Sequence, residues 1–233
     1  MSRIMVLNID FSIQSMTSEI HPVVLQDDRN VVLVDCGYVG SLPLLEKEMH
    51  KNGAAPEGLT HLLLTHHDHD HMGAAAALLK KYPSIQVVAS AKETPFIDGT
   101  AKSPRLIQAE NLQKCLSEDQ KAFGEKFCAM LRSIQPVHVD IQVNDGDTFD
   151  WCENCVVLGT SGHTEGHISL WIKNEKTVIA GDAATIENGE LVIANPQFTL
   201  EAKSAHKSLQ TIKNFSEETI ICYHGGVYQQ NQH

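Results

Sequence analysis

The sequence lacks the features that would mark a membrane, secreted or nucleic-acid-binding protein. No run approaches the roughly 18 apolar residues of a membrane-spanning helix, and the first residues, MSRIMVLNIDFSIQ, contain no long apolar core of a signal peptide. No basic block offsets the formal net charge of −11, which argues against binding to nucleic acid or anionic lipid. We therefore expect a cytoplasmic protein whose partner is a small-molecule substrate, with no nucleic acid and no membrane; a homodimer is left open.

A disulfide framework is also missing. Six cysteines occur in 233 residues without a secretion signal, so reduced thiols are expected. The Cys-x-x-Cys formed by Cys152 and Cys155 has no second pair, which favours a structural role over a redox or zinc-ribbon role. Cys36 and Cys222 are interpreted as small core residues.

Apolar runs and turn signals predict an alternation of strands and helices. In the first half we expect strands at 31–37, 60–65 and 85–90, and helices at 41–53 and 72–83. Strand-rich sequence returns at 139–196, and a helix at 200–215 and a strand from 219 follow. Two halves that each mix strands with helices predict an α+β fold, with sheets packed face to face and helices outside.

The segment at about 91–137 differs from its surroundings, because it is polar, helix-prone and weakly periodic. We interpret it as a helical insertion or cap within a single domain that spans residues 1–233. The stretch ETPFIDG opens this insertion. It predicts either an apolar wall of Phe96 and Ile97 over a site, or an ordinary loop anchored by Pro95.

The stretch LLLTHHDHDHMG (62–73) holds four histidines and two aspartates in six consecutive residues, directly behind an apolar run. Alternate positions of an extended loop share a face. His66, Asp68 and Asp70 can therefore converge, with His71 turned in where a helix begins. So many polar groups behind a buried strand would need costly desolvation without a cation, which favours a metal site over an ordinary polar loop.

In this register His67 and His69 face the other way. They are interpreted as solvent-facing, or as neighbours that orient a ligand carboxylate. The alternative register, in which His67, His69 and His71 converge, stays open.

Further metal-capable residues lie in three later turns that contain glycine and follow apolar runs. GTSGHTEGH supplies His163 and His167, VIAGDA supplies Asp182, and CYHGG supplies His224. His167 is interpreted as a supporting residue, because His163 already fills the ligand position.

With these motifs in this order, the sequence resembles the metallo-β-lactamase superfamily, whose signature is a His-x-His-x-Asp-His loop followed by a lone His, an Asp and a final His. The resemblance spans essentially the whole chain. Within the superfamily, the sequence most resembles a group of bacterial hydrolase-like proteins of unassigned substrate. The motifs that carry this resemblance are the THxDxDH form of the loop, ETPFIDG, SGHTEGHISL, AGDA…NGEL and CYHGG. The resemblance implies a four-layer αββα sandwich, with Asp35 hydrogen-bonded to backbone or to a metal-binding histidine near the site.

The resemblance also implies two divalent metal ions, with Zn²⁺ expected. Their ligands would be His66, Asp68 and His163 for the first ion and Asp70, His71 and His224 for the second, with Asp182 bridging. Most relatives have histidine where Asp68 stands. Because an oxygen ligand makes the first site harder, Mn or Fe competes there. Flavodiiron proteins of the superfamily place a glutamate at this position, which keeps a non-haem diiron redox enzyme as an alternative.

Two divalent ions roughly 3.5–4 Å apart can acidify a shared water and polarise a carbonyl. We therefore expect a metal-dependent hydrolase that cleaves an ester, lactone or thioester with a metal-bridged hydroxide, and in which Asp70 also accepts a proton. A metal-stabilised protein without turnover is the other alternative. Quorum-quenching lactonases carry a tyrosine three residues after the bridging aspartate; Thr185 stands here, which weakens the lactonase interpretation.

Overall fold

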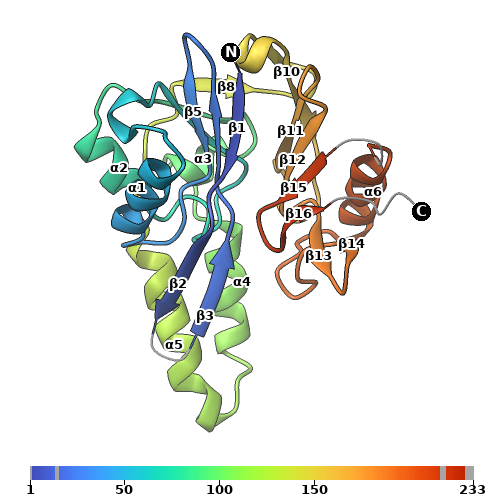
Figure 1. Cartoon of the computed structure of the whole chain (residues 1–233). Helices are drawn as coiled ribbons and strands as arrows, with labels where there is room; N and C mark the ends of the chain where they lie inside the picture. Colours follow the sequence, from blue (N-terminus) through green and yellow to red (C-terminus); the bar gives the residue numbers. More distant parts are fainter. Residues whose placement is uncertain (1, 14–15, 216–218, 229–233) are drawn as a thin grey trace.

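A computed structural model describes residues 2–13, 16–215 and 219–228 (Figure 1). Two six-stranded sheets pack against each other, and two further pairs of strands form separate hairpins. Helices cover the outer faces of the two large sheets. The expected αββα sandwich of the α+β class is therefore confirmed.

The first sheet is mostly parallel. Its strands have the spatial order β1-β4-β5-β6-β7-β8, and β5 to β8 run parallel to one another. The bounds are β1 (Arg3–Val6), β4 (Val23–Gln26), β5 (Val31–Val34), β6 (His61–Leu64), β7 (Gln86–Ser90) and β8 (Ile141–Val143). The hairpin of β2 (Ile9–Ile13) and β3 (Met16–Ile20) lies between β1 and β4 in the chain.

The second sheet has the order β16-β15-β12-β11-β10-β9. Strands β12 and β15 pair in parallel, whereas the other neighbours in this order pair antiparallel. The bounds are β9 (Thr148–Phe149), β10 (Cys155–Gly159), β11 (Ile168–Ile172), β12 (Thr177–Gly181), β15 (Thr219–Cys222) and β16 (Gly226–Tyr228). A second hairpin, β13 (Thr185–Glu187) with β14 (Glu190–Val192), follows β12.

The central strands are apolar on both faces because each face is buried against a different layer. On β5, Val32 and Val34 contact the core between the sheets, while Leu33 contacts the core under the helices. On β6 the intersheet residue is Leu63, flanked by Leu62 and Leu64 on the helix side. Continuous apolar runs such as VVLV and LLL are typical of strands that are covered on both sides.

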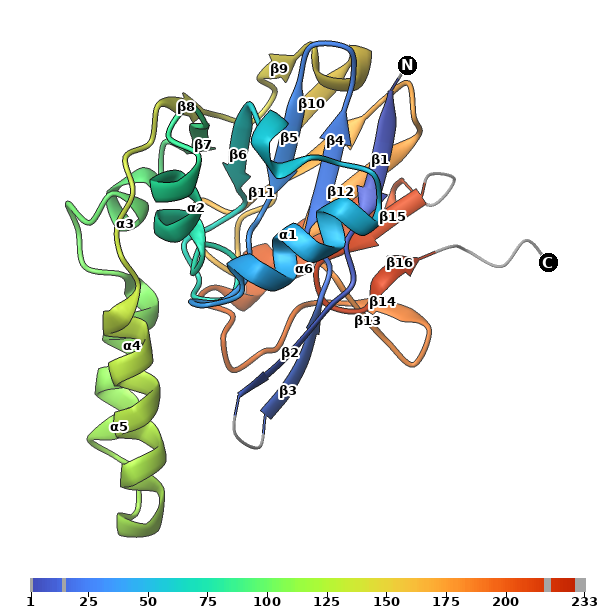
Figure 2. The same ribbon diagram turned by 60° about the vertical axis from the view of Figure 1, so that its left-hand side comes forward.

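Helices pack on both outer faces, and two of them extend beyond the sandwich. The bounds are α1 (Leu42–Lys51), α2 (Ala75–Lys81), α3 (Thr94–Ile97), α4 (Pro104–Gln113), α5 (Glu118–Ser133) and α6 (Ala202–Lys213), with short 3₁₀ turns η1 (Pro56–Gly58) and η2 (Trp151–Glu153). In both views the pair of α4 and α5 projects away from the sheets (Figure 2). These helices occupy most of the segment that the sequence indicated as a helical insertion.

The predicted strands and helices of the first half are present, although their ends differ. The strand expected over 31–37 ends at Val34, because Asp35 has a positive φ of 59° and turns the chain. The strands before residue 27 were not predicted. Among the residues that the structure describes, no helix combines the length and apolar composition needed to cross a membrane.

The four cysteines discussed in the sequence analysis behave as small apolar residues. Cys36 and Cys222 are fully buried in two different apolar clusters. Cys152 and Cys155 are free and buried, and burial raises the pKa of the Cys152 thiol to about 11 and that of Cys155 to about 12. Thiols with such a high pKa are poor nucleophiles, in agreement with the structural interpretation of the Cys-x-x-Cys.

Candidate metal centre

The predicted ligands lie on loops that follow strands of both sheets. The His66–His71 loop follows β6 of the first sheet, whereas His163, Asp182 and His224 follow β10, β12 and β15 of the second. Strands β10, β12 and β15 run in the same direction, so their carboxyl ends meet at one edge. Residues that are far apart in the chain thus come together where the two sheets end.

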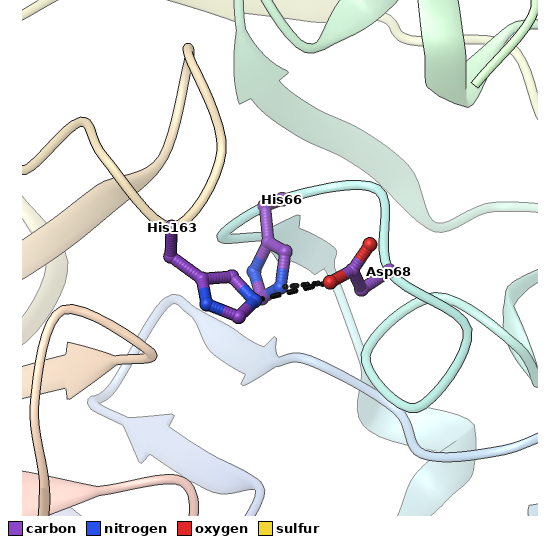
Figure 3. A group of neighbouring side chains, drawn as sticks. All are labelled: His66, Asp68 and His163. Carbon is purple, nitrogen blue, oxygen red and sulfur yellow. Dashed lines mark hydrogen bonds and ion pairs between the residues drawn. The ribbon is translucent and has the colours of Figure 1, made fainter. Parts of the chain in front are cut away.

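The first group contains His66, Asp68 and His163, which point toward one another (Figure 3). Oδ2 of Asp68 lies 3.0 Å from Nε2 of His163 and 3.5 Å from Nε2 of His66. All three residues are buried.

The second group contains Asp70, His71 and His224. Oδ2 of Asp70 lies 3.1 Å from Nε2 of His224 and 3.8 Å from Nε2 of His71. Asp182 faces both groups. Its Oδ1 is 3.4 Å from Nε2 of His71, and its Oδ2 is 3.5 Å from Nε2 of His163.

Several atoms at this centre have no hydrogen-bond partner. Nε2 of His66, Nε2 of His71 and Oδ1 of Asp182 are buried and unpaired in the described structure. Buried polar atoms are normally hydrogen-bonded. These three neighbouring atoms without hydrogen-bond partners are imidazole nitrogens and a carboxylate oxygen, which are atoms that coordinate divalent metals. They therefore fit a metal site.

The charges of the centre favour a cation. Burial lowers the pKa of His71, but the carboxylates of Asp182 and Asp35 outweigh it and raise this pKa well above its ordinary value. The pKa of His224 is likewise raised by Asp182 and Asp70 against the effect of burial. Without a metal, the neighbouring carboxylates thus favour the protonated forms of His71 and His224.

A model of the metallo-β-lactamase superfamily matches residues 19–224, a range that includes both groups and Asp182. The chain belongs to the metallo-β-lactamase superfamily. The resemblance found in the sequence is confirmed.

Two curated proteins are similar to the chain over most of its length. It is 24% identical over 210 residues to a probable metallo-hydrolase of Bacillus subtilis (strain 168), covering 85% of this chain and 76% of that protein. It is 27% identical over 201 residues to a hydroxyacylglutathione hydrolase of Enterobacter sp. (strain 638), covering 85% of this chain but 59% of that protein. Family, relatives and the His/Asp cluster together support a metal-dependent hydrolase.

Solved structures show the same fold. A metallo-β-lactamase family protein from Thermus thermophilus has a TM-score of 0.71 at 22% identity, covering 97% of this chain and 74% of that one. An archaeal superfamily protein from Sulfolobus tokodaii has a TM-score of 0.69 at 18% identity, covering 97% and 81%.

In this metallo-β-lactamase superfamily member, Asp35 supports the loop after β6. Its Oδ1 accepts a hydrogen bond from the backbone N of Thr65 at 2.9 Å, and its Oδ2 lies 2.8 Å from Nδ1 of His71. His71 therefore donates from Nδ1 and presents Nε2 to the centre. The prediction that Asp35 hydrogen-bonds backbone or a candidate ligand histidine is confirmed.

His167 supports Asp182, as interpreted from the sequence. Its Nε2 accepts a hydrogen bond from the backbone N of Asp182 at 2.9 Å, and its Nδ1 lies 2.9 Å from Oγ1 of Thr160. Burial and the neighbouring charge of His66 lower the pKa of His167 well below its ordinary value, so the ring stays neutral and can accept at Nε2.

His67 is not solvent-facing, which makes that part of its interpretation wrong. It is buried, and both its Nδ1 and its backbone N are hydrogen-bonded to Oε2 of Glu93. Oε1 of Glu93 accepts from Oγ1 of Thr164 and from the backbone N of Gly166, both at 2.8 Å. Glu93 thereby joins the His66–His71 loop to the loop that carries His163.

His69 lies at the edge of the centre. Its ring makes edge contacts with Tyr38 and Phe127, with centroids 5.6 and 5.7 Å apart, and its Nδ1 is 3.4 Å from Oδ1 of Asp70. In the described chain, the groups able to hold a metal include neither His67 nor His69. The geometry thus favours the first register, while metal binding by the seven predicted residues stays a prediction.

Two residues near the final histidine hold backbone. The buried hydroxyl of Tyr223 donates to the carbonyl O of Asp70 at 2.6 Å, and Oγ1 of Thr185 donates to the carbonyl O of His224 at 2.7 Å. Ile97 belongs to the core under the helices rather than to a wall over the site, and the ring of Phe96 lies 5.0 Å from that of His67.

Arg105 was not predicted as part of the centre. This residue is buried in the first turn of α4, and its guanidinium contacts both oxygens of Asp68. Burial tends to raise the pKa of Asp68, but Arg105 and the hydrogen bond from His163 hold it well below its ordinary value. A lone arginine in a polar helical segment carries no pattern that indicates such a contact.

Proposed function

We propose that this superfamily member is a dinuclear metal-dependent hydrolase that cleaves a small ester, lactone or thioester. The observation that carries the proposal is a set of three overlapping His/Asp groups, in which Asp182 with His66 and His71 connects the first group to the second, together with unpaired nitrogen and oxygen atoms at the centre. The names of the relatives support hydrolysis, and that of the Enterobacter protein specifies an acyl derivative of glutathione.

The proposed ligands follow the two groups. His66, Asp68 and His163 would hold one ion, and Asp70, His71 and His224 the other, with Asp182 between them. Bound divalent ions, with Zn²⁺ expected and Mn or Fe as alternatives, supply acidified water and polarisation of the substrate carbonyl.

Asp70 is the proposed proton acceptor during cleavage. Its Oδ2 faces His224, whereas its Oδ1 lies 3.4 Å from Nδ1 of His69 at the edge of the centre. A proton taken up by Asp70 therefore has a neighbouring ring nitrogen that can pass it toward the exterior.

A cavity of about 250 Å³ lies next to this route. The residues that line it are Tyr38, Val39, His69, Met130 and Ser133. These described lining residues include no carboxylate, lysine or arginine. The cavity therefore suits an uncharged organic group next to the scissile carbonyl.

Elemental analysis of purified protein, followed by a panel of uncharged esters, lactones and thioesters at neutral pH, tests this function. We expect up to two divalent ions per chain and hydrolysis of at least one class. Asp182→Ala should reduce hydrolysis to background, because it removes the carboxylate between the two groups. A metal-loaded wild type that cleaves nothing on the panel would contradict the proposal and favour a metal-stabilised protein without turnover.

A diiron redox enzyme is the second candidate, favoured by the oxygen ligand that Asp68 would contribute. Metal analysis combined with a visible absorption spectrum separates the two. A colourless protein with two zinc ions supports the hydrolase, whereas two irons with visible absorption support the redox enzyme.

A further inference from the structure

We propose that Arg105 makes the two metal positions unequal in their affinity for a metal ion. A metal ion can enter the first position, formed by His66, Asp68 and His163, only in competition with the Arg105 guanidinium. The inference rests on the metal loading in the proposed function and adds an order to it. The position of Asp70, His71 and His224 fills first and tightly, and that of His66, Asp68 and His163 fills second and weakly.

The guanidinium of Arg105 donates hydrogen bonds to both carboxylate oxygens of Asp68. Nη2 of Arg105 lies 2.6 Å from Oδ2 of Asp68, and Nε lies 3.0 Å from Oδ1 and 3.1 Å from Oδ2. Only 2% of the Arg105 side chain and 5% of that of Asp68 are exposed. A charge-assisted bidentate contact shielded from water is strong, and it neutralises the carboxylate that the first metal ion needs.

The same atoms would have to bind the metal ion. Oδ2 of Asp68, which receives the shortest bond from Arg105, is also the oxygen that faces the histidine nitrogens of the first group. Nη2 of Arg105 is in addition 3.4 Å from Nε2 of His163. The guanidinium therefore lies beside both the carboxylate oxygen and the histidine nitrogen that a metal ion would require.

Contacts from α4 itself and from the loop before α6 hold Arg105 in this position. Its Nη1 donates to Oε1 of Gln108 at 2.6 Å, and its Cζ lies 5.1 Å from the ring centre of Phe198. Gln108 is itself tied to the carbonyl O of Gln197 at 3.0 Å. The cation is thus seated between α4 and the loop before α6, and it cannot leave Asp68 without breaking these contacts.

Among the described residues, the second position has no comparable cation. Within the described part of the chain, the ion pairs of Asp70 and Asp182 are all with histidines. A guanidinium stays charged in proteins, so a metal ion that enters the first position must share Asp68 with a fixed positive charge. This arginine contact at the first position, without a counterpart at the second in the described chain, is the physical reason for the unequal affinities.

Calorimetric titration of the metal-free full chain with Zn²⁺, repeated with Co²⁺ for its absorption bands, tests the inference. We expect the wild type to bind one equivalent tightly and a second at least about tenfold more weakly. In Arg105→Met the second equivalent should tighten at least about tenfold. Arg132→Met is the matched control: this arginine, on α5, pairs with Glu110 and its side chain is 54% exposed, so both affinities should stay unchanged.

Two equal affinities in the wild type, or a second equivalent that is unchanged, weaker or lost in Arg105→Met, would overturn the inference. If Arg105→Met does not fold by circular dichroism, Arg105→Gln decides, because it removes the charge beside Asp68 but keeps a hydrogen-bond donor there. Tightening of the second equivalent supports the inference, and no change or weakening overturns it. These readouts use no substrate, so an inactive protein with the expected titration would refute only the hydrolase proposal.

Discussion

Among single residues, Glu93 connects the two halves of the candidate centre. It is fully buried, and its two oxygens accept hydrogen bonds from His67 on one loop and from Thr164 and Gly166 on the other. Burial tends to raise the pKa of Glu93, but the hydrogen bond and charge of His67 lower it below its ordinary value. Glu93 therefore acts as an anion that positions both loops.

Replacing Glu93 tests this positioning role. Glu93→Gln keeps the shape but removes the charge that His67 faces, so we expect metal affinity to fall roughly 10–100-fold, as for other residues that orient metal ligands. Metal titration and circular dichroism provide the measurement. Glu57→Gln, at an exposed site, should leave metal affinity unchanged; an equal loss in both variants would contradict the role of Glu93.

At the scale of elements, the hairpin of α4 and α5 has a small core of its own. Ala109, Cys128 and Leu131 form an apolar cluster separate from the cores of the sandwich. Arg105, in the first turn of α4, connects this hairpin to the candidate centre. The hairpin should therefore open locally more easily than the sheets do.

Leu131→Ala tests the separate core of the hairpin. Loss of a buried leucine side chain creates a cavity and typically costs about 2–5 kcal/mol. We expect faster amide hydrogen exchange confined to α4 and α5, while exchange in β5 and β6 stays slow. The control is Phe123→Ala, on the same helix but 63% exposed, which should change hydrogen exchange little. If Leu131→Ala instead accelerated exchange throughout both sheets, the hairpin would unfold only together with the whole chain.

For the whole molecule, the candidate ligands come from both halves of the chain and both sheets. The His66–His71 loop belongs to the first half, and His163, Asp182 and His224 belong to the second. A metal ion that binds only the folded arrangement stabilises it by mass action, by about 2.7 kcal/mol at a hundredfold excess over Kd. Metal loading should therefore stabilise the whole sandwich rather than a single loop.

This stabilisation should depend on pH in a defined direction. In the metal-free protein the pKa values of His71 and His224 are raised. Their contribution to stability is therefore fully present below about pH 6.5, the unfolded-state value, and is lost as pH rises through the raised values. Metal ions must displace those protons, so metal affinity rises over the same range.

We therefore expect chelation to lower Tm, and the difference in Tm between loaded and chelated protein to widen from about pH 6 to about pH 8.5, as the protons leave the two histidines. Differential scanning calorimetry of both forms at several pH values provides the measurement. A Tm difference that is constant or narrows toward high pH would show that His71 and His224 do not exchange protons for metal.

Much of the fold could be predicted because its signals are local. The runs VVLV and LLL identify strands that are covered on both faces, and the spacing of His66, Asp68, Asp70 and His71 on one loop indicates a shared face. Those patterns were sufficient for the superfamily, the sandwich and the residues that converge. The strands before residue 27 were missed, because most of them are short and mix polar with apolar residues.

The sequence by itself determined which residues carry metal-capable groups and which strands place them at the sheet ends, since both follow from short-range spacing. Only the tertiary structure decided that the Arg105 guanidinium pairs with the Asp68 carboxylate and that Glu93 joins the two loops. Each of these contacts is made between residues with no periodic relation along the chain. The physical reason is that a buried charge takes its partner from whatever the fold brings within hydrogen-bonding distance.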